Sequence, residues 1–312
     1  MIVIGVDGGG TKTAVEAFAV TPGMEISPEL MPAAAAKAGP MNYNFVGVDA
    51  AADNLMQAIA ALGIAPEEIG AVGIADPSID DCMPADETSS SAQFVKKVQN
   101  SLGVPVFVRS DAYITLYGLT GGQEPAVLQL AGTGAMAISQ DKDRKVEVAG
   151  GWGRLTGDEG SGYYIGVEAV KAALQAADGI APATVLTEKL QAFFGVQSPR
   201  ELIPVFYGDP EPDIAAFSKV VDECARQGDE VALGILQRAA QYLAAYTGQL
   251  IEKSGSKKVG IYGSVLCQNR QVRQTYEQIL VDRYKDITVT EPPVSAARAA
   301  AMYAAQMWKE NN

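Results

Sequence analysis

The first twenty residues constrain the fold most, because they place a run of glycines between two strands. Ile2–Val6 is short and β-branched, as a buried strand should be, and Thr13–Val20 reads as a second strand. The turn between them, DGGGTK, resembles a P-loop, but Thr11 stands where that motif requires lysine. The pattern therefore predicts a glycine hairpin, not a strand–turn–helix nucleotide motif.

A second hairpin of the same kind begins near residue 126. Val127–Ala131 runs into Gly132-Thr133-Gly134, and Ala135–Ser139 then alternates like a strand. The glycines fit the dinucleotide fingerprint superficially, but that motif requires a helix where this sequence predicts a strand. Two glycine hairpins suggest that the two halves of the chain repeat one design.

The rest of the chain alternates strands with helices, which predicts an α/β architecture. Residues 76–92 are acidic and serine-rich, and we expect an exposed surface loop there. Strands are expected at 69–75, 104–108, 146–149 and 259–262, and helices at 49–63, 94–102, 162–178, 184–195, 213–253 (with a pause at 228–229) and 295–309.

Composition excludes several kinds of chemistry. The chain has no histidine and three scattered cysteines, which removes Ser-His-Asp catalysis, histidine-ligated zinc and a disulfide framework. The net charge, 24 − 37 = −13, opposes binding to nucleic acid or to an anionic membrane surface. The N-terminus enters a strand without a signal-peptide pattern, so we expect a cytoplasmic location.

The glycine loops suit an anion. Consecutive glycines let backbone N–H groups converge on a phosphate, and the hydroxyls of Thr11, Thr13 and Thr133 can add donors. Asp7, at the carboxyl end of a strand, can hold Mg²⁺ through water. The alternative is that both loops are only tight hairpin turns.

Three segments carry a family resemblance: GVDGGGTKT from Gly5, LAGTGA from Leu130 and GGWGRLTGDEGSG from Gly150. They resemble the N-acetylglucosamine kinases of the BadF/BadG/BcrA/BcrD ATPase family, in the actin/hexokinase/Hsp70-like superfamily. The resemblance implies two ribonuclease H-like domains, residues 1–120 plus 295–312 and residues 121–294, with ATP and substrate in the cleft between them. It also implies that the last helix packs on the first domain.

The resemblance assigns roles to individual residues. Asp111 would be the base that accepts the sugar hydroxyl proton, although an N-cap of the helix at 112–119 is the structural alternative. Asp7 would hold Mg²⁺, and Asp158 would contact the sugar or the metal. The sugar would be bound by Asn42, Gly151, Trp152 and Asp158, and ATP by Gly9, Gly10, Thr11, Lys12, Thr13, Gly132, Thr133, Gly134, Gly263 and Ser264. The structural alternatives are a surface turn for Asn42 and a core position for Trp152.

The expected function is ATP-dependent phosphorylation of an amino sugar, N-acetylglucosamine at its C6 hydroxyl, by a possible homodimer. Glucosamine, N-acetylmuramic acid and other hexoses are alternative acceptors. A second class is an ATPase that drives a reductase or dehydratase, but three isolated cysteines do not favour the iron–sulfur cluster of such activators. A sugar-sensing regulator is a third class, and the sequence offers no helix-turn-helix for it.

Overall fold

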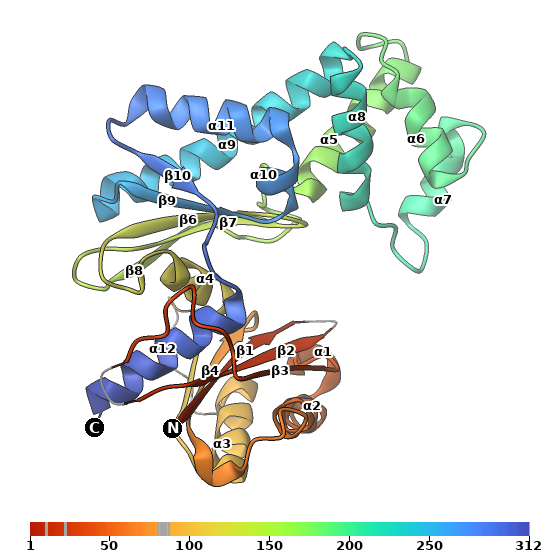
Figure 1. Cartoon of the computed structure of the whole chain (residues 1–312). Coiled ribbons are helices and arrows are strands. Elements are labelled where there is room, and N and C mark those ends of the chain that lie inside the picture. The colour runs from red at the N-terminus through yellow and green to blue at the C-terminus, as the bar shows by residue number, and fades with distance from the viewer. Residues whose placement is uncertain (10–11, 22–23, 80, 82–85, 87, 312) are drawn as a thin grey trace. The chain divides into compact units, whose positions relative to one another are not determined.

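The chain folds into two compact units, each built around one five-stranded sheet (Figure 1). The structure is a computed structural model that describes residues 1–9, 12–21, 24–79, 81, 86 and 88–311. The first unit comprises Met1–Ala126, Gln140–Glu147 and Pro292–Asn312, and the second comprises Val127–Ser139 and Val148–Glu291. This arrangement of strands and helices confirms the predicted α/β class.

The first sheet has the strand order β3-β2-β1-β4-β5, in which β1, β4 and β5 are parallel and β2 and β3 run antiparallel to their neighbours. Parallel neighbours bring the carboxyl ends of β1, β4 and β5 to one edge of the sheet. The elements of this unit are β1 (Ile2–Gly8), β2 (Thr13–Ala19), β3 (Ala34–Ala38), α1 (Tyr43–Val46), α2 (Val48–Ala60), η1 (Pro66–Glu68), β4 (Ile69–Asp76), α3 (Ser90–Leu102), β5 (Val106–Ser110), α4 (Asp111–Thr120) and α12 (Ala296–Asn311).

Both faces of the first sheet are buried. Successive side chains of a strand point to opposite faces, so neighbouring residues of β1 enter different cores. Ile4 and Val6 contribute to a core with residues of α2 and α3, whereas Val3 faces the opposite core with alanines of α12. In Figure 1 α12 crosses the face of the sheet opposite α2 and α3. The last helix of the chain therefore completes the first unit.

The helix α12 approaches the sheet unusually closely, because glycines lie beneath it. A Cβ atom added at Gly73 in β4 would lie 2.0 Å from the carbonyl oxygen of Ala300, and one at Gly5 in β1 would lie 1.8 Å from that of Ala297. Real Cβ atoms do not approach so near. The small residues on both surfaces thus set the distance between helix and sheet.

The second sheet has the order β10-β9-β6-β7-β8, with β9 parallel to both β6 and β10. Its buried face packs against α5 and the 25-residue helix α9. The elements are β6 (Ala126–Ala131), β7 (Ala135–Gln140), β8 (Val146–Gly150), α5 (Gly162–Ala177), α6 (Leu186–Phe194), η2 (Pro199–Glu201), α7 (Leu202–Phe206), η3 (Ala215–Phe217), α8 (Ser218–Arg226), α9 (Glu230–Ser254), β9 (Lys258–Tyr262), α10 (Ser264–Gln268), α11 (Arg270–Arg283) and β10 (Thr288–Thr290).

Most expected elements are present, with shifted ends. The pause predicted at residues 228–229 separates α8 from α9, where Asp229 caps α9 by accepting a hydrogen bond from the Ala232 N–H. Neither the strand β3 nor the helix α11 was expected, because β3 consists mostly of alanine and the sequence of α11 is mostly polar. No helix in the described part of the chain is both long and apolar enough to cross a bilayer.

Candidate active site

Acidic side chains gather where the parallel strands of the first sheet end. In the sheet register Asp7 of β1 lies beside Ala75 of β4, and Asp76 lies beside Ser110 of β5. Asp111 follows directly as the first residue of α4. Three segments distant in sequence therefore place carboxylates at a single edge.

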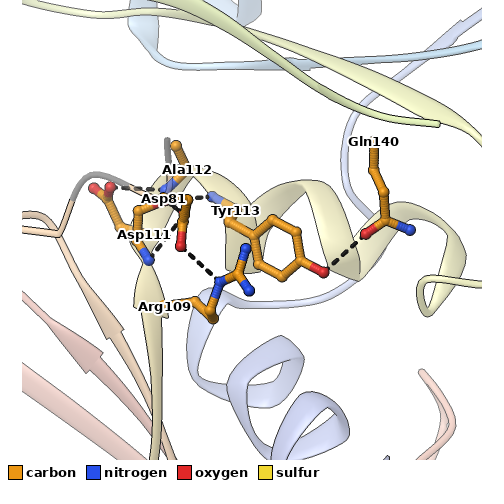
Figure 2. A network of polar contacts seen from close by, with 7 residues as sticks. Asp81, Arg109, Asp111, Ala112, Tyr113 and Gln140 are labelled. Atoms are coloured by element: carbon orange, nitrogen blue, oxygen red, sulfur yellow. Dashed lines mark hydrogen bonds and ion pairs between the residues drawn. The ribbon is translucent and has the colours of Figure 1, made fainter. Parts of the chain in front are cut away.

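Asp111 begins a helix without capping it. The N-cap of α4 is Ser110, whose hydroxyl accepts a hydrogen bond from the Tyr113 N–H at 2.9 Å. Asp111 Oδ1 accepts from the Ala112 N–H at 2.7 Å, as Figure 2 shows. The alternative reading of Asp111 as the N-cap is therefore wrong.

The surroundings of Asp111 favour its protonated form. Its pKa is raised, chiefly because burial disfavours the charge, and the carboxylates of Asp7, Asp76 and Asp81 add to the effect. The hydrogen bond from the Ala112 N–H opposes the shift. A carboxylate with a raised pKa at the end of a strand has the properties of a general base.

Asp76 is a member of this cluster that sequence reasoning missed. Its residue is 1% exposed, its Oδ1 accepts from the Ser78 N–H at 2.8 Å, and its Oδ2 has no hydrogen-bond partner among the described residues. Its pKa is raised, chiefly because burial disfavours the charge. The expectation of an exposed loop at 76–92 is wrong for this residue, which ends a buried strand.

Burial of the Asp76 charge should lower the stability of the folded protein at neutral pH. A carboxyl whose pKa is higher in the folded than in the unfolded state destabilises the fold above that pKa, and the cost disappears as the pH falls. We expect Asp76→Asn to raise the melting temperature at pH 7 and to have a smaller effect at pH 4. Thermal melts at both pH values test this. A variant that melts below the parent protein at pH 7 would contradict it.

Asn42 lies beside the same edge. Its Oδ1 atom accepts from the Asn44 N–H at 3.1 Å and from the Ser78 hydroxyl at 3.2 Å. The preceding residue, Met41, donates its N–H to the carbonyl oxygen of Gly9. These bonds tie Asn42 to the ends of β1 and β4, so its position is more constrained than that of an ordinary surface turn.

The N-terminal glycine turn follows β1. The Gly9 N–H donates to the carbonyl oxygen of Lys12 at 3.0 Å, and the Lys12 charge stabilises the ionised form of Asp7. The pKa of Asp7 is nevertheless raised, chiefly by burial. The hydroxyl of Thr13 is buried and donates to the Gly39 carbonyl at 2.8 Å, so it is already engaged. Gly10 and Thr11, predicted to bind phosphate, lie outside the described residues.

A magnesium ion would fit this edge if one or two carboxylates and several waters supplied its ligands. No group of three His, Cys, Asp or Glu side chains within the described residues could enclose a metal ion. Mg²⁺ ordinarily takes only one or two carboxylates and keeps several waters. Asp7 could hold it in that way, and the positive charge would relieve the repulsion among the buried carboxylates.

In the second unit, the loop Gly132–Gly134 is exposed at its tip and fixed at its base. The Gly132 N–H donates to the Gly134 carbonyl, and the Gly162 N–H donates to the Gly132 carbonyl at 2.8 Å. Gly263, at a φ of 96°, lies so close that an added Cβ would be 2.5 Å from the Ala131 carbonyl oxygen. The structure thus brings together two loops that the sequence predicted to bind nucleotide.

A cavity of about 350 Å³ opens beside this loop and is lined by Thr133, Gly134 and Asp158. A Cβ atom added at Gly134 would lie 3.0 Å from Asp158 Oδ2, so glycine permits this approach. Burial raises the pKa of Asp158, while the Ala135 N–H stabilises its charged form. Arg154 also lines the cavity, and its guanidinium pairs with Glu211 at 2.7 Å.

The tryptophan of the GGWG segment is exposed. Trp152 has 76% of its surface accessible, which rules out the core position that was its alternative, and the neighbouring Gly151 donates its N–H to the Ala135 carbonyl. An exposed indole offers an apolar face to a ligand.

A second cavity, of about 230 Å³, lies next to Ser264 at the start of α10 and is also lined by Ser218 and Asp222 of α8. Ser218 and Asp222 were not predicted as site residues, because a polar helix surface resembles any solvated face.

The family follows from comparison with known proteins. The sequence pattern of the BadF/BadG/BcrA/BcrD ATPase family matches residues 4–304. The chain belongs to this family. It is 31% identical over 258 residues to an N-acetylmuramic acid/N-acetylglucosamine kinase of Clostridium acetobutylicum, covering 80% of this chain and 79% of that one. It is 28% identical over 272 residues to an N-acetyl-D-glucosamine kinase of Dictyostelium discoideum, covering 82% and 81%.

Solved structures share the fold of this ATPase family member. A Chromobacterium violaceum protein, provisionally named an N-acetylglucosamine kinase, superposes with a TM-score of 0.74 at 22% identity over 97% of this chain and 98% of that one. A glucokinase of Streptomyces griseus, solved with glucose and AMPPNP, superposes with a TM-score of 0.55 at 18% identity, over 98% and 100%. These likenesses confirm the predicted fold.

Proposed function

We propose that this protein is an ATP-dependent kinase that phosphorylates an amino sugar, N-acetylglucosamine at its C6 hydroxyl. The proposal depends mainly on the position of Asp111. Its carboxylate is half-buried, has a raised pKa and lies at the sheet edge where Asp7 and Asp76 also lie. A kinase needs such a base beside the acceptor hydroxyl. Two relatives in the family are named as kinases of N-acetylglucosamine.

Each residue would have a limited task. The carboxylate of Asp111 accepts the proton of the attacking sugar hydroxyl. Asn42, in the same unit as Asp111, hydrogen-bonds to another hydroxyl of the sugar. Asp158 and Trp152 of the second unit remain predicted sugar contacts, Trp152 through the apolar face of its ring. A magnesium ion held through Asp7 would neutralise phosphate charge.

The nucleotide would be held by the second unit. The loop Gly132–Gly134 presents its exposed Thr133 to the phosphates, and Gly263, which precedes Ser264 in the chain, lies beside the base of that loop. The cavity between α10 and α8 has the polar lining that a nucleoside requires. Lys12 and Gly9 in the first unit remain predicted phosphate ligands.

An N-acetylmuramic acid acceptor is a second candidate, favoured by the position of Arg154. This residue lines the same cavity as Asp158, and the lactyl group of that sugar carries a carboxylate that a guanidinium can bind. We expect Arg154→Met to lower kcat/KM for N-acetylmuramic acid by about tenfold, a typical worth of one charged hydrogen bond, and to leave N-acetylglucosamine unaffected. Equal effects on the two sugars would contradict this role.

The raised pKa of Asp111 predicts the acid side of the pH profile. A base works only when ionised, and kcat/KM reports the ionisation of the free enzyme. The acid limb of kcat/KM for the sugar should therefore lie above the pKa of about 3.9 of an ordinary aspartate. Initial rates measured from pH 4 to pH 8 test this. A limb at or below 3.9 would contradict the assignment of Asp111 as the base.

The proposal is tested by following ADP release from ATP and magnesium with a panel of free sugars. The panel contains N-acetylglucosamine, N-acetylmuramic acid, glucosamine and glucose, and the product is located by NMR. Turnover that requires both a sugar and magnesium, with phosphate on the C6 oxygen, would support the proposal. Hydrolysis of ATP that is independent of every sugar would favour the partner-driving ATPase instead.

A further inference from the structure

One acidic residue beside the proposed base forms contacts that the catalytic roles above do not use. The side chain of Asp81 is only 3% exposed, although it lies in the segment that was expected to be an exposed loop. Its Oδ1 atom accepts from Arg109 Nε at 2.6 Å, and its Oδ2 atom accepts from both the N–H (3.2 Å) and the hydroxyl of Ser110. Three donor groups on two adjacent residues of β5 therefore converge on one buried carboxylate.

These contacts reach the start of α4 through Ser110. The Ser110 hydroxyl donates to Asp81 and at the same time accepts from the Tyr113 N–H, so one hydroxyl links the carboxylate to the first helical turn. Asp111 is the next residue and belongs to that same turn. The serine can make both bonds only when its side chain has one orientation.

Arg109 is held on its other side by an aromatic ring. Its guanidinium carbon lies 3.9 Å from the centre of the Tyr113 ring, and the Tyr113 hydroxyl donates to Gln140 Oε1 at 2.8 Å. Figure 2 shows the arginine between Asp81 and this ring. Because the guanidinium is fixed from two sides, it holds the carboxylate of Asp81 in one place.

We propose that Asp81 is a positioning residue that, paired with Arg109, anchors the Ser110 cap and so fixes the backbone and the carboxylate of Asp111. This inference rests on the proposed function, since it assigns Asp81 a part in the same phosphoryl transfer. Asp81 does not touch the reacting atoms. It acts on them only through the hydrogen bonds of Ser110.

The physical reason is that a base whose position varies transfers protons less efficiently. Ser110 would cap α4 without Asp81, but its hydroxyl could then rotate, and the first turn would lose its tie to the segment after β4. A displacement of about 1 Å of a catalytic group can reduce turnover by about 100-fold. Arg109 pairs with Asp81 at 2.6 Å, so the charge of the anchor is balanced by a neighbouring guanidinium even though it still contributes to the raised pKa of Asp111.

The test compares variants along this chain of contacts. Asp81→Ala removes the anchor, Ser110→Ala removes the relay, and Ser110→Thr keeps a hydroxyl at the same place. Asp86→Ala is the matched control, because Asp86 is an exposed carboxylate five residues away that bonds only to Thr88 among the described residues. Steady-state constants for the accepted sugar and for ATP are measured for each folded variant.

We expect Asp81→Ala and Ser110→Ala each to lower kcat by about 10- to 100-fold, with KM values within about twofold of the parent protein. Ser110→Thr should restore kcat. The double variant should be no worse than the poorer single variant, because Asp81 acts on the helix start through Ser110. A kcat that is unchanged in both single variants, or losses that multiply in the double variant, would overturn the inference.

A measurement that needs no activity separates this inference from the proposed function. Amide hydrogen exchange at Ala112 and Tyr113 should be faster in Asp81→Ala and unchanged in Asp86→Ala. If the parent protein phosphorylates no sugar, the proposed function fails, and the exchange rates alone decide whether Asp81 holds the helix start. Unchanged exchange at both amides would overturn the positioning role.

Discussion

Replacing Asp111 by asparagine should lower kcat for sugar phosphorylation by about 10³-fold, because an amide cannot accept the proton of the sugar hydroxyl. The substitution preserves the shape of the side chain and keeps an oxygen that can accept the hydrogen bond from the Ala112 N–H. The KM values for sugar and ATP should therefore change little. Steady-state kinetics with saturating magnesium measure the effect.

The matched control is Asp141→Asn. Asp141 also accepts backbone hydrogen bonds through its carboxylate, from the N–H groups of Asp143 and Lys145, but it lies in an exposed turn. Its kcat should equal that of the parent protein. If Asp111→Asn keeps more than about a tenth of the parent rate, Asp111 is not the base and another carboxylate of the cluster must take its place.

The second large effect concerns stability. Gly73→Ala should destabilise the first unit by about 3 kcal/mol, since the new methyl group would meet the backbone of α12 rather than a movable side chain. The contact, 2.0 Å from the Ala300 carbonyl oxygen, can be relieved only by shifting the helix or the strand. Urea or thermal unfolding of the purified variant measures the loss.

Gly70→Ala, in the same strand β4, is the control for this prediction. There the atoms nearest to the added methyl group belong to the side chain of Met1, which can move aside. We expect a change below about 1 kcal/mol. Equal stabilities of the two variants would show that α12 does not pack against β4 as closely as described.

Several candidate site residues could be predicted from the sequence because they lie in glycine-rich turns or at strand ends. Asp7 and Asp111 were predicted at the ends of strands, and the loops at Gly132 and Gly263 were predicted to bind nucleotide. The structure places each at the end of a strand or helix start as expected. These positions could be predicted because a strand end followed by glycine or by a helix is encoded within a few adjacent residues, whereas nucleotide binding by the two loops stays a prediction.

Asp76 and Asp81 were not found in this way, because they lie in an acidic, serine-rich segment that is typical of a surface loop. Their burial depends on partners elsewhere in the chain. Asp81 is covered because Arg109 and Ser110 donate to it, and Asp76 because β4 is paired on both sides. Nothing in the local sequence indicates those partners.

Local spacing and residue type were thus enough to predict the two glycine hairpins, the α/β class and the position of Asp111 directly after a strand. The role of Asp111 as a base stays a prediction. Only the tertiary structure decided which carboxylates meet at the edge of the first sheet and which side chain holds the start of α4. The physical reason is that the local sequence of a loop does not distinguish a solvated carboxylate from a buried one. Whether it is buried depends on donors that strand pairing brings from distant parts of the chain.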